Sequence, residues 1–151
     1  MNSTNHFSRL SYVFFTILYA IMLWLAIYYH SMVGQPGIIL NHGIAFGWLS
    51  RASSWLISMG TGLVILILTI GLWRIHELRI SVSWILAGAT ANWTNRILWG
   101  GVVDYWQLKP YPYIFNLADV CIRLGTLVLV VQAYFLLRKN TAKSYPGGHN
   151  R

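Results

Sequence analysis

Four apolar segments of about 20 residues recur along this chain of 151 residues, and they limit its fold more than any other feature. They cover residues 10–29, 55–73, 80–102 and 117–137. An α-helix rises 1.5 Å per residue, so about 20 residues cross the roughly 30 Å hydrocarbon core of a bilayer. The composition agrees, because 56% of the residues are hydrophobic and only 9% are charged, whereas soluble domains carry about 25% charged residues. We therefore predict an all-α membrane protein with four transmembrane helices.

The segments outside these helices are short, so a single domain is expected. Residues 1–139 form the predicted membrane domain, and residues 140–151, which end in a proline- and glycine-containing stretch, are expected to be a short disordered tail. Residues 35–47 combine a proline with several glycines and β-branched residues. This composition favours a small loop or β-hairpin region after the first helix.

Lysine and arginine are distributed unequally between the two predicted sides of the membrane. An even number of spans brings both termini to one side, which collects seven of these residues, while the other side has two. Cytoplasmic loops carry the excess of positive residues, so we expect a multi-pass protein with both termini in the cytoplasm. The seven are Arg9, Arg74, Arg79, Arg138, Lys139, Lys143 and Arg151, and the two are Arg51 and Lys109.

The charge and the cysteine content exclude several classes of protein. The net charge is +8, but the basic residues do not form a patch interleaved with stacking aromatics, so no nucleic-acid partner is expected. The single cysteine, Cys121, excludes an intrachain disulfide and a multi-cysteine metal site. The five histidines show no metal-ligand spacing, so no metal is expected either.

The only two aspartates of the chain, Asp104 and Asp119, fall at one predicted depth, near the extracytoplasmic face. The third span runs outward and Asp104 lies at its outer end, while the fourth begins on that side with Asp119 just inside it. Two carboxylates held close together do not both ionise easily, so such a pair shares a proton, as in aspartic proteases. The ionised member could activate a water while its protonated partner protonates the leaving amine.

Polar residues recur at helical spacing with these two aspartates. The repeats are Asn92, Arg96, Gly100 and Asp104 in the third span, if that helix extends so far, and Asn116, Asp119 and Arg123 in the fourth. A central Asp or Arg facing lipid costs about 2.5–3.5 kcal/mol on insertion scales, so both stripes should face inward. Arg96 and the asparagines could then hold substrate carbonyls or stabilise an oxyanion. The open alternative is that Arg96 and Arg123 only form structural ion pairs with the aspartates.

Aromatic residues gather around the same segments. Trp93, Trp99, Tyr105 and Trp106 are expected to be membrane-interface anchors, because amphipathic rings collect at that boundary. Cys121 lies two positions past Asp119 and is therefore rotated off its face, so we expect it to pack against a neighbouring helix.

Three stretches resemble motifs of the signal peptidase II (lipoprotein signal peptidase) family. Residues 41–47, NHGIAFG, resemble that family's Asn-x-Gly-x-Ala-Phe-Gly motif. Residues 91–96, ANWTNR, followed by GGVVDY at 100–105, are similar to Gly-Asn-x-x-Asp-Arg followed by Val-Val-Asp-Phe. Residues 115–119, FNLAD, resemble Phe-Asn-x-Ala-Asp. The motifs occur in family order, from residue 41 to about residue 125.

The resemblance implies a bacterial inner-membrane endopeptidase. Such enzymes remove the signal peptide of a prolipoprotein by cutting before a cysteine that carries a diacylglyceryl group. By position, Asp104 and Asp119 match the catalytic pair. The positions that match supporting and substrate-lining residues are Asn41, Gly43, Asn92, Arg96 and Asn116. The resemblance further implies no metal or organic cofactor, contact with membrane lipids, and inhibition by a peptide of the globomycin type.

Departures from the family pattern leave two other functions open. The first span lacks the usual Asp-x-x-Ser/Thr-Lys, Asn95 stands in place of an aspartate, and Ala91 replaces a glycine. One alternative is a catalytically silent homologue that binds lipidated precursors, although such a protein would more often have lost one aspartate. The other is a small proton or ion carrier, whose charges would be spread across the membrane depth rather than gathered at one end.

Overall fold

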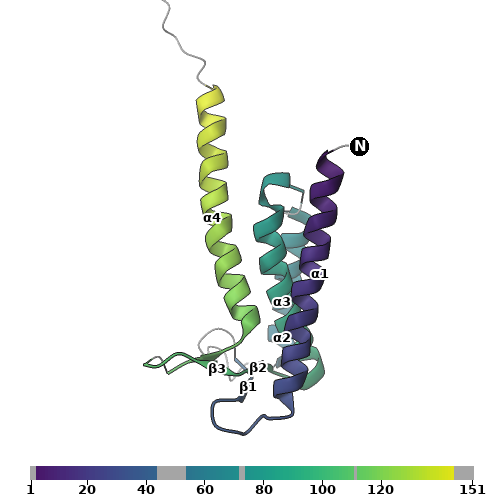
Figure 1. The fold of residues 1–151 in the computed structure, drawn as a ribbon, viewed down its shortest axis with the longest axis vertical. Coiled ribbons are helices and arrows are strands. Elements are labelled where there is room, and N and C mark those ends of the chain that lie inside the picture. Colours follow the sequence, from purple (N-terminus) through teal and green to yellow (C-terminus); the bar gives the residue numbers. More distant parts are fainter. Residues whose placement is uncertain (1–2, 44–53, 72–73, 111, 145–151) are drawn as a thin grey trace, which may run out of the picture.

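The computed structural model describes residues 3–43, 54–71, 74–110 and 112–144, most of which are helical. The helices are α1 (Ser3–His30), α2 (Ser54–Gly71), α3 (Arg79–Trp99) and α4 (Leu117–Ser144), and the short 3-10 helix η2 (His76–Leu78) leads into α3. The first turns of α1 and the last turns of α4 lie at one end of the molecule, and the strands lie at the opposite end (Figure 1).

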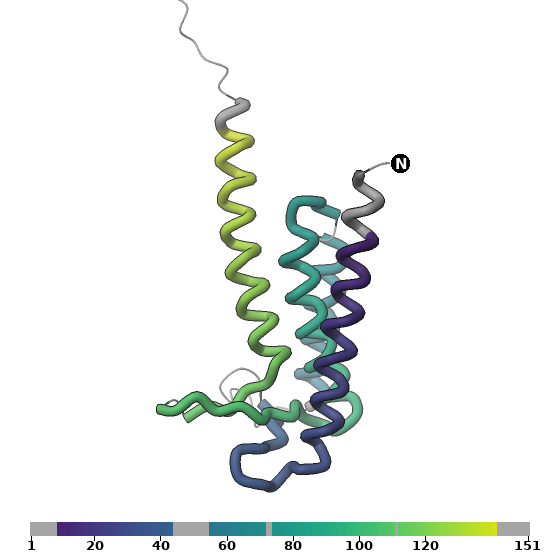
Figure 2. Tube along the Cα trace, viewed as in Figure 1, coloured from purple at the N-terminus to yellow at the C-terminus, as the bar shows by residue number. Residues whose placement is uncertain are grey.

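Helix α3 is the central element, and the other three helices pack around it (Figure 2). It supplies the largest share of the buried polar side chains among the described residues, namely Ser81, Ser83, Asn95 and Arg96. Apolar surroundings require hydrogen bonds for such groups. Ser81 Oγ, for example, donates a hydrogen bond of 2.7 Å to Gln132 Oε1 on α4.

The outer helices expose large apolar side chains instead. Two segments within the described residues are long and apolar enough to cross a membrane, Arg9–His30 with 22 residues and Leu117–Thr141 with 25, and α2 adds the shorter apolar stretch Trp55–Gly71. Leu56 on α2 is 68% exposed and Leu137 on α4 is 67% exposed. A surface of this kind, with polar groups inside, suits a lipid environment rather than water.

Helices α3 and α4 approach each other closely because two glycines lie between them. A Cβ atom placed on Gly88 would lie 2.5 Å from the carbonyl oxygen of Ala118. One placed on Gly125 would lie 2.8 Å from Cβ of Trp84. Small residues at a helix interface let the backbones pack together in membranes, and here they bring the start of α4 against the middle of α3.

Four short strands form two small antiparallel sheets at the end where α4 begins (Figure 1). β1 (Ile39–Asn41) pairs with β2 (Val102–Asp104), and β3 (Trp106–Gln107) pairs with β4 (Ile114–Phe115). The loop or hairpin region predicted after the first helix thus contributes one strand. Its partner, however, comes from the segment after α3 and not from the same loop.

Three helix boundaries differ clearly from the predicted segments, and one of them is the start of α1 at Ser3 rather than at residue 10. The third helix does not reach residue 102 but ends at Trp99, because Gly100 adopts a left-handed conformation (φ 72°) and Val102 and Val103 favour a strand. Asp104 therefore does not extend the face of Asn92 and Arg96. The fourth helix continues past its predicted end at residue 137 to Ser144, because the chain contains no proline before Pro146 in this segment. The rest of the predicted disordered tail, 145–151, lies outside the described residues.

Candidate active site

The carboxyl group of Asp119 is placed by the first turn of α4. Asn116 precedes the helix, and its Oδ1 accepts a hydrogen bond of 3.0 Å from the backbone N–H of Asp119. The backbone N–H of Asn116 in turn lies 3.4 Å from Asp119 Oδ2. This reciprocal pair is a capping box with aspartate at the third helical position. It holds the carboxylate at a helix N-terminus, where the helix dipole favours negative charge.

The carboxyl group of Asp104 is placed by the sheet β1–β2. Asp104 is only 2% exposed, and Asn41 on the paired strand donates a hydrogen bond of 2.9 Å from Nδ2 to Asp104 Oδ2. Asn95, which stands at a departure from the family motif, is buried and supports this strand, since its Oδ1 lies 3.4 Å from the N–H of Val103. A strand thus supplies one aspartate and a helix supplies the other.

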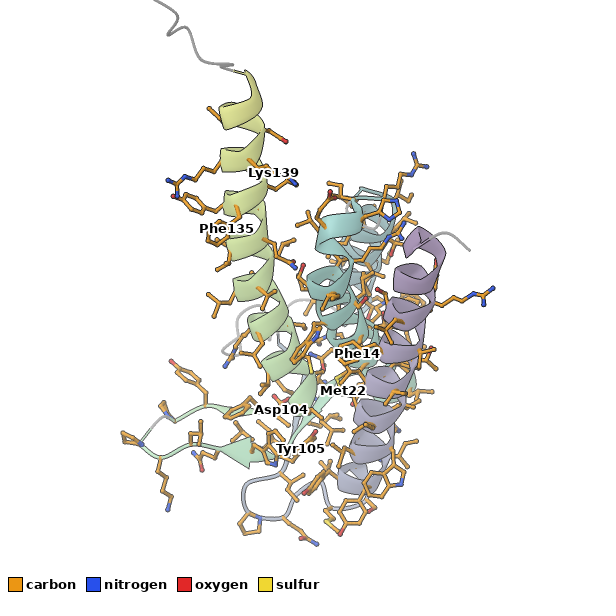
Figure 3. All side chains as sticks on the ribbon, turned by 45° about the horizontal axis from the view of Figure 1, so that its top comes forward. Phe14, Met22, Asp104, Tyr105, Phe135 and Lys139 are labelled. Carbon is orange, nitrogen blue, oxygen red and sulfur yellow. The ribbon has the colours of Figure 1, made fainter. Side chains whose placement is uncertain are left out.

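Two asparagines join the two carboxyl groups in one hydrogen-bond network. Asn116 Nδ2 donates to Asp104 Oδ1 at 2.8 Å and lies 3.2 Å from Asn92 Oδ1. Asn92 Nδ2 donates to Asp119 Oδ1 at 2.9 Å. The chain of contacts therefore runs from Asp104 through Asn116 and Asn92 to Asp119. Figure 3 shows Asp104 where the strands meet the start of α4, far from Phe135 and Lys139 near the other end of that helix.

Arg96 and Gly43 extend this network toward the loop after β1. Arg96 Nη2 donates to the carbonyl oxygen of Gly43, and the N–H of Gly43 donates to Asn41 Oδ1 at 2.9 Å. Arg96 is only 8% exposed, and its Nη1 has no hydrogen-bond partner among the residues that the structure describes. A buried guanidinium nitrogen of this kind is a ready donor for a carbonyl oxygen or an oxyanion.

A cavity of about 300 Å³ opens onto this network. Five of the predicted site residues line it, together with side chains from α2, α3, α4 and the β3–β4 arm. The lining includes Asn41, Asn92, Arg96, Asp104 and Asp119, and further Thr61, Tyr113, Phe115 and Arg123. The site therefore combines acids, amides and a cation with apolar walls, which is the usual make-up of a ligand site.

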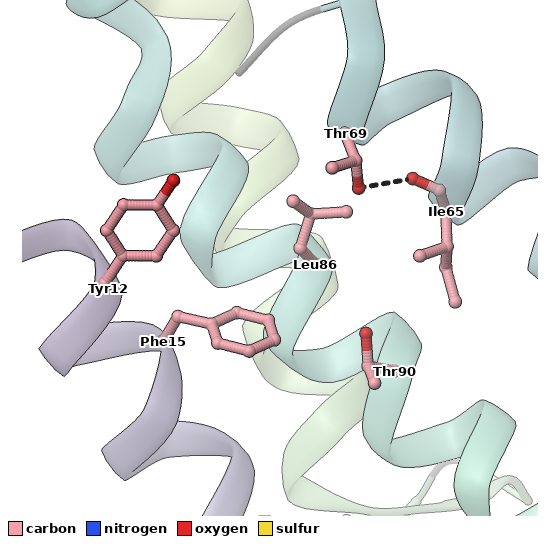
Figure 4. Close-up of a pocket in the computed structure, with 6 residues that line it drawn as sticks. All are labelled: Tyr12, Phe15, Ile65, Thr69, Leu86 and Thr90. Atoms are coloured by element: carbon pink, nitrogen blue, oxygen red, sulfur yellow. Dashed lines mark hydrogen bonds between the residues drawn. The ribbon is translucent and has the colours of Figure 1, made fainter. Parts of the chain in front are cut away.

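A second cavity of about 320 Å³ lies between α1, α2 and α3 (Figure 4). Its walls are aromatic and aliphatic apart from the hydroxyl groups of Tyr12, Thr69 and Thr90, and Thr69 donates its proton to the carbonyl oxygen of Ile65 at 2.7 Å. Among the described residues, no carboxyl group, amide or cation lines it, whereas the first cavity has all three.

Burial gives the Asp104 carboxyl unusual acid–base behaviour. Loss of solvation, to which the negative charge of Asp119 adds, raises the pKa of Asp104 to about 7, while the amides of Asn41 and Asn116 and the charge of Arg96 oppose this rise. A carboxyl group with such a pKa can both hold and release a proton near neutral pH, as a general acid must.

The structure brings all seven predicted site residues into contact with this network or its cavity. They are Asp104, Asp119, Asn41, Gly43, Asn92, Arg96 and Asn116. The second half of the first motif, at residues 44–47, lies outside the described residues. No group of three or more His, Cys, Asp or Glu side chains that could hold a metal occurs in the part of the chain that the structure describes.

Several aromatic residues have roles that the sequence did not indicate. Tyr105 was predicted to anchor at the membrane interface, but it is only 9% exposed. Its hydroxyl oxygen accepts a hydrogen bond of 3.2 Å from the N–H of Leu117, and its ring stacks on Tyr29 at 4.2 Å. Trp93 donates its indole N–H to the carbonyl oxygen of Ser58 at 2.9 Å and so ties α2 to α3. In the sequence, the position of Tyr105 directly after Asp104 is the one feature that indicates a role of Tyr105 near the site.

Fold and site together define a class of protein: a helical membrane protein with two carboxyl groups gathered beside one cavity at one end. The sequence profile of the signal peptidase (SPase) II family matches residues 34–135. A lipoprotein signal peptidase of Dichelobacter nodosus is 38% identical over 62% of this chain and 67% of its own length. Another, of Blochmanniella pennsylvanica, is 30% identical over 93% of this chain and 98% of its own length. This chain belongs to the signal peptidase II family, and it is therefore a membrane protease.

Solved structures of bacterial membrane enzymes share the fold. One, determined by the in meso method at 2.3 Å resolution, has a TM-score of 0.59 and 20% sequence identity and covers 90% of this chain and 94% of its own. Another, at 1.9 Å resolution, has a TM-score of 0.61 and 20% identity and covers 80% of this chain and 91% of its own. At this level of identity the likeness concerns the fold alone.

Proposed function

We propose that this protein is an aspartic endopeptidase that removes the signal peptides of diacylglyceryl-modified prolipoproteins. Asp104 and Asp119 are its catalytic pair. The observation that carries the proposal is the hydrogen-bond network through Asn116 and Asn92, which joins the two carboxyl groups beside one cavity. Family membership supplies the reaction, because the curated relatives are lipoprotein signal peptidases.

The two carboxyl groups divide the acid–base work of peptide hydrolysis. The ionised aspartate accepts a proton from a water molecule, whose oxygen forms a bond to the scissile carbonyl carbon. The protonated aspartate then donates its proton to the leaving amine as the C–N bond breaks. Arg96 and Asn92 lie at the cavity wall, where their N–H groups stabilise the developing oxyanion and hold neighbouring carbonyls of the substrate.

In this proposal the chain crosses the bacterial inner membrane with four helices, and the site lies at the extracytoplasmic face. The proposal is supported by the common end at which α1 begins and α4 finishes (Figure 1) and by the seven Lys and Arg residues assigned to that side against two. Residues 1–139 then act as one membrane domain with both termini in the cytoplasm.

The partners follow from this location. A prolipoprotein presents its signal peptide within the membrane, so membrane lipids surround both the enzyme and its substrate. A cyclic peptide inhibitor of the globomycin type would act by occupying the cavity beside Asp104 and Asp119. The proposed hydrolysis uses water and protein side chains only, without a metal or an organic cofactor.

Cleavage of a diacylglyceryl-modified prolipoprotein by the purified protein in lipid tests the proposal. Wild type should release the signal peptide, and Asp104→Asn and Asp119→Asn should each lose at least about 10²–10⁴-fold in rate, because each removes one proton-transfer group. Glu77→Gln removes the third acid of the chain, which lies in η2 away from the site, and should keep wild-type activity. If wild type bound several lipidated precursors and cut none, the protein would instead be a silent homologue.

A further inference from the structure

Arg123 lies on α4 one helical turn beyond Asp119 and lines the same cavity. Residues four apart share one face of a helix, so the two side chains are neighbours. Arg123 falls inside the apolar segment Leu117–Thr141, where a cation is expensive unless it faces a polar group. The polar groups of the cavity, with Asp119 among them, are therefore the surroundings that Arg123 needs.

The guanidinium of Arg123 lies over an aromatic ring. The guanidinium carbon lies 5.9 Å from the ring centre of Phe115 on β4, a cation–π contact. Phe115 packs edge-on against Trp106, which contacts Tyr105 at 5.4 Å, and Tyr105 stacks on Tyr29 at the end of α1. A continuous series of ring contacts thus connects the support of Arg123 to the helical bundle.

The two aspartates have different cationic neighbours. Arg123 lies one helical turn from Asp119 on α4, and Arg96 on α3 lines the same cavity. Arg96 is the cation that lowers the pKa of Asp104 on β2. Its effect on this pKa is smaller than the opposite effect of the negative charge on Asp119. An opposite charge within about 4–6 Å favours the charged form of a carboxyl group. The cations therefore act on the two members of the pair unequally.

We infer that Arg123 is a positioning residue of the catalytic pair: its guanidinium, held on Phe115 one turn from Asp119, keeps Asp119 as the ionised member and leaves the shared proton on Asp104. The inference rests on the proposed function. It assigns the two roles, since Asp119 accepts the proton of the attacking water and Asp104 supplies the proton to the leaving amine. The α4 capping box acts in the same direction, because it places Asp119 at a helix N-terminus.

The pH dependence of kcat/KM separates this role from a structural one. In Arg123→Gln the base Asp119 loses the cation one helical turn away and stays ionised only at higher pH, so the acid limb of the profile should move up. Opposite charges shift carboxyl groups by about 1–3 pH units when buried, and Arg123 is exposed, so we expect about 0.5–1 unit after solvent screening. Arg123→Lys keeps the charge and should restore most of the wild-type profile.

Two further variants complete the experiment. Arg138→Gln removes a cation from the same helix far from the cavity, and its profile should superimpose on that of wild type. Phe115→Leu retains the charge but removes its aromatic support, and it should move the acid limb in the same direction by less. This second variant keeps the inference testable if Arg123→Gln does not fold.

An acid limb that stays in place in Arg123→Gln, or activity that falls by one factor at every pH, overturns the inference and marks Arg123 as structural. The proposed function fails differently, through a wild-type protein that does not cut or through Asp104→Asn and Asp119→Asn variants that do. The two failures are therefore distinguishable in one set of assays.

Discussion

The two halves of the site are built by different kinds of structure. Asp119 is fixed by local geometry, since Asn116, three residues earlier, caps the same helix turn and bonds to the same carboxyl group. Asp104 is fixed by long-range geometry, since its partner Asn41 lies 63 residues earlier in the chain. The helical half therefore depends on the first turn of α4. The strand half depends on the pairing of β1, which precedes α2 in the chain, with β2, which follows α3.

The difference shows which contacts make one site out of two halves. Asn116 belongs to the helical half as the cap of α4, yet its Nδ2 reaches Asp104 Oδ1 on the strand. The close approach at Gly88 sets the distance between α3, which carries Asn92, and α4, which carries Asp119. Substitutions at Gly88 and at Asn116 should therefore disturb the site in different ways.

The largest effect is expected from Gly88→Ala. The added methyl group would lie 2.5 Å from the carbonyl oxygen of Ala118, so the two helices must separate. Overpacking of this kind costs about 1–3 kcal/mol in unfolding free energy, and a displacement of about 1 Å at a catalytic group costs about 100-fold in rate. Thermal unfolding in detergent and the cleavage rate should both fall. Gly60→Ala on α2, where nothing lies within 4 Å, is the matched control and should keep both.

A smaller effect, on activity more than on stability, is expected from Asn116→Ser. Serine can still cap α4, but it loses the amide that bonds to Asp104 and Asn92. A hydrogen bond to a charged group contributes about 1.5–3 kcal/mol, which corresponds to roughly 10–100-fold in rate. Asn116→Ala removes the cap as well, so it should lower the unfolding temperature further. Wild-type activity in Asn116→Ser would show that the two halves do not act through this residue.

The sequence predicted the helical half of the site well. The spacing of Asn116, Asp119 and Arg123 placed them on one face of the fourth helix, and Asn116 and Asp119 indeed contact each other there. Helical periodicity and capping are local properties, so a single sequence contains the information. The same locality explains why α1, α2 and α4 fall on predicted apolar segments, although α1 begins earlier and α4 ends later than predicted.

The strand half was less accessible to sequence analysis. The apolar run through Val102 and Val103 suggested a longer third helix, and only the structure shows that Gly100 ends it and that β2 pairs with β1. Strand pairing between distant segments leaves no periodic signal in sequences of three residues. The motif resemblance predicted Asp104 and Asn41 as site residues, but the reason why they meet lies in the pairing of β1 with β2.

The central claim is that the strand-borne and the helix-borne carboxyl groups form one proton-sharing pair. Because Asp104 and Asp119 are the only aspartates of the chain, protein made by cell-free synthesis with side-chain carboxyl ¹³C-aspartate gives two signals in an NMR pH titration. The account predicts that the pair retains one proton up to about pH 7, the pKa to which burial raises Asp104, and that Asp119→Asn alters the Asp104 signal. Two carboxyl groups that titrate independently at ordinary values near pH 4 would contradict it.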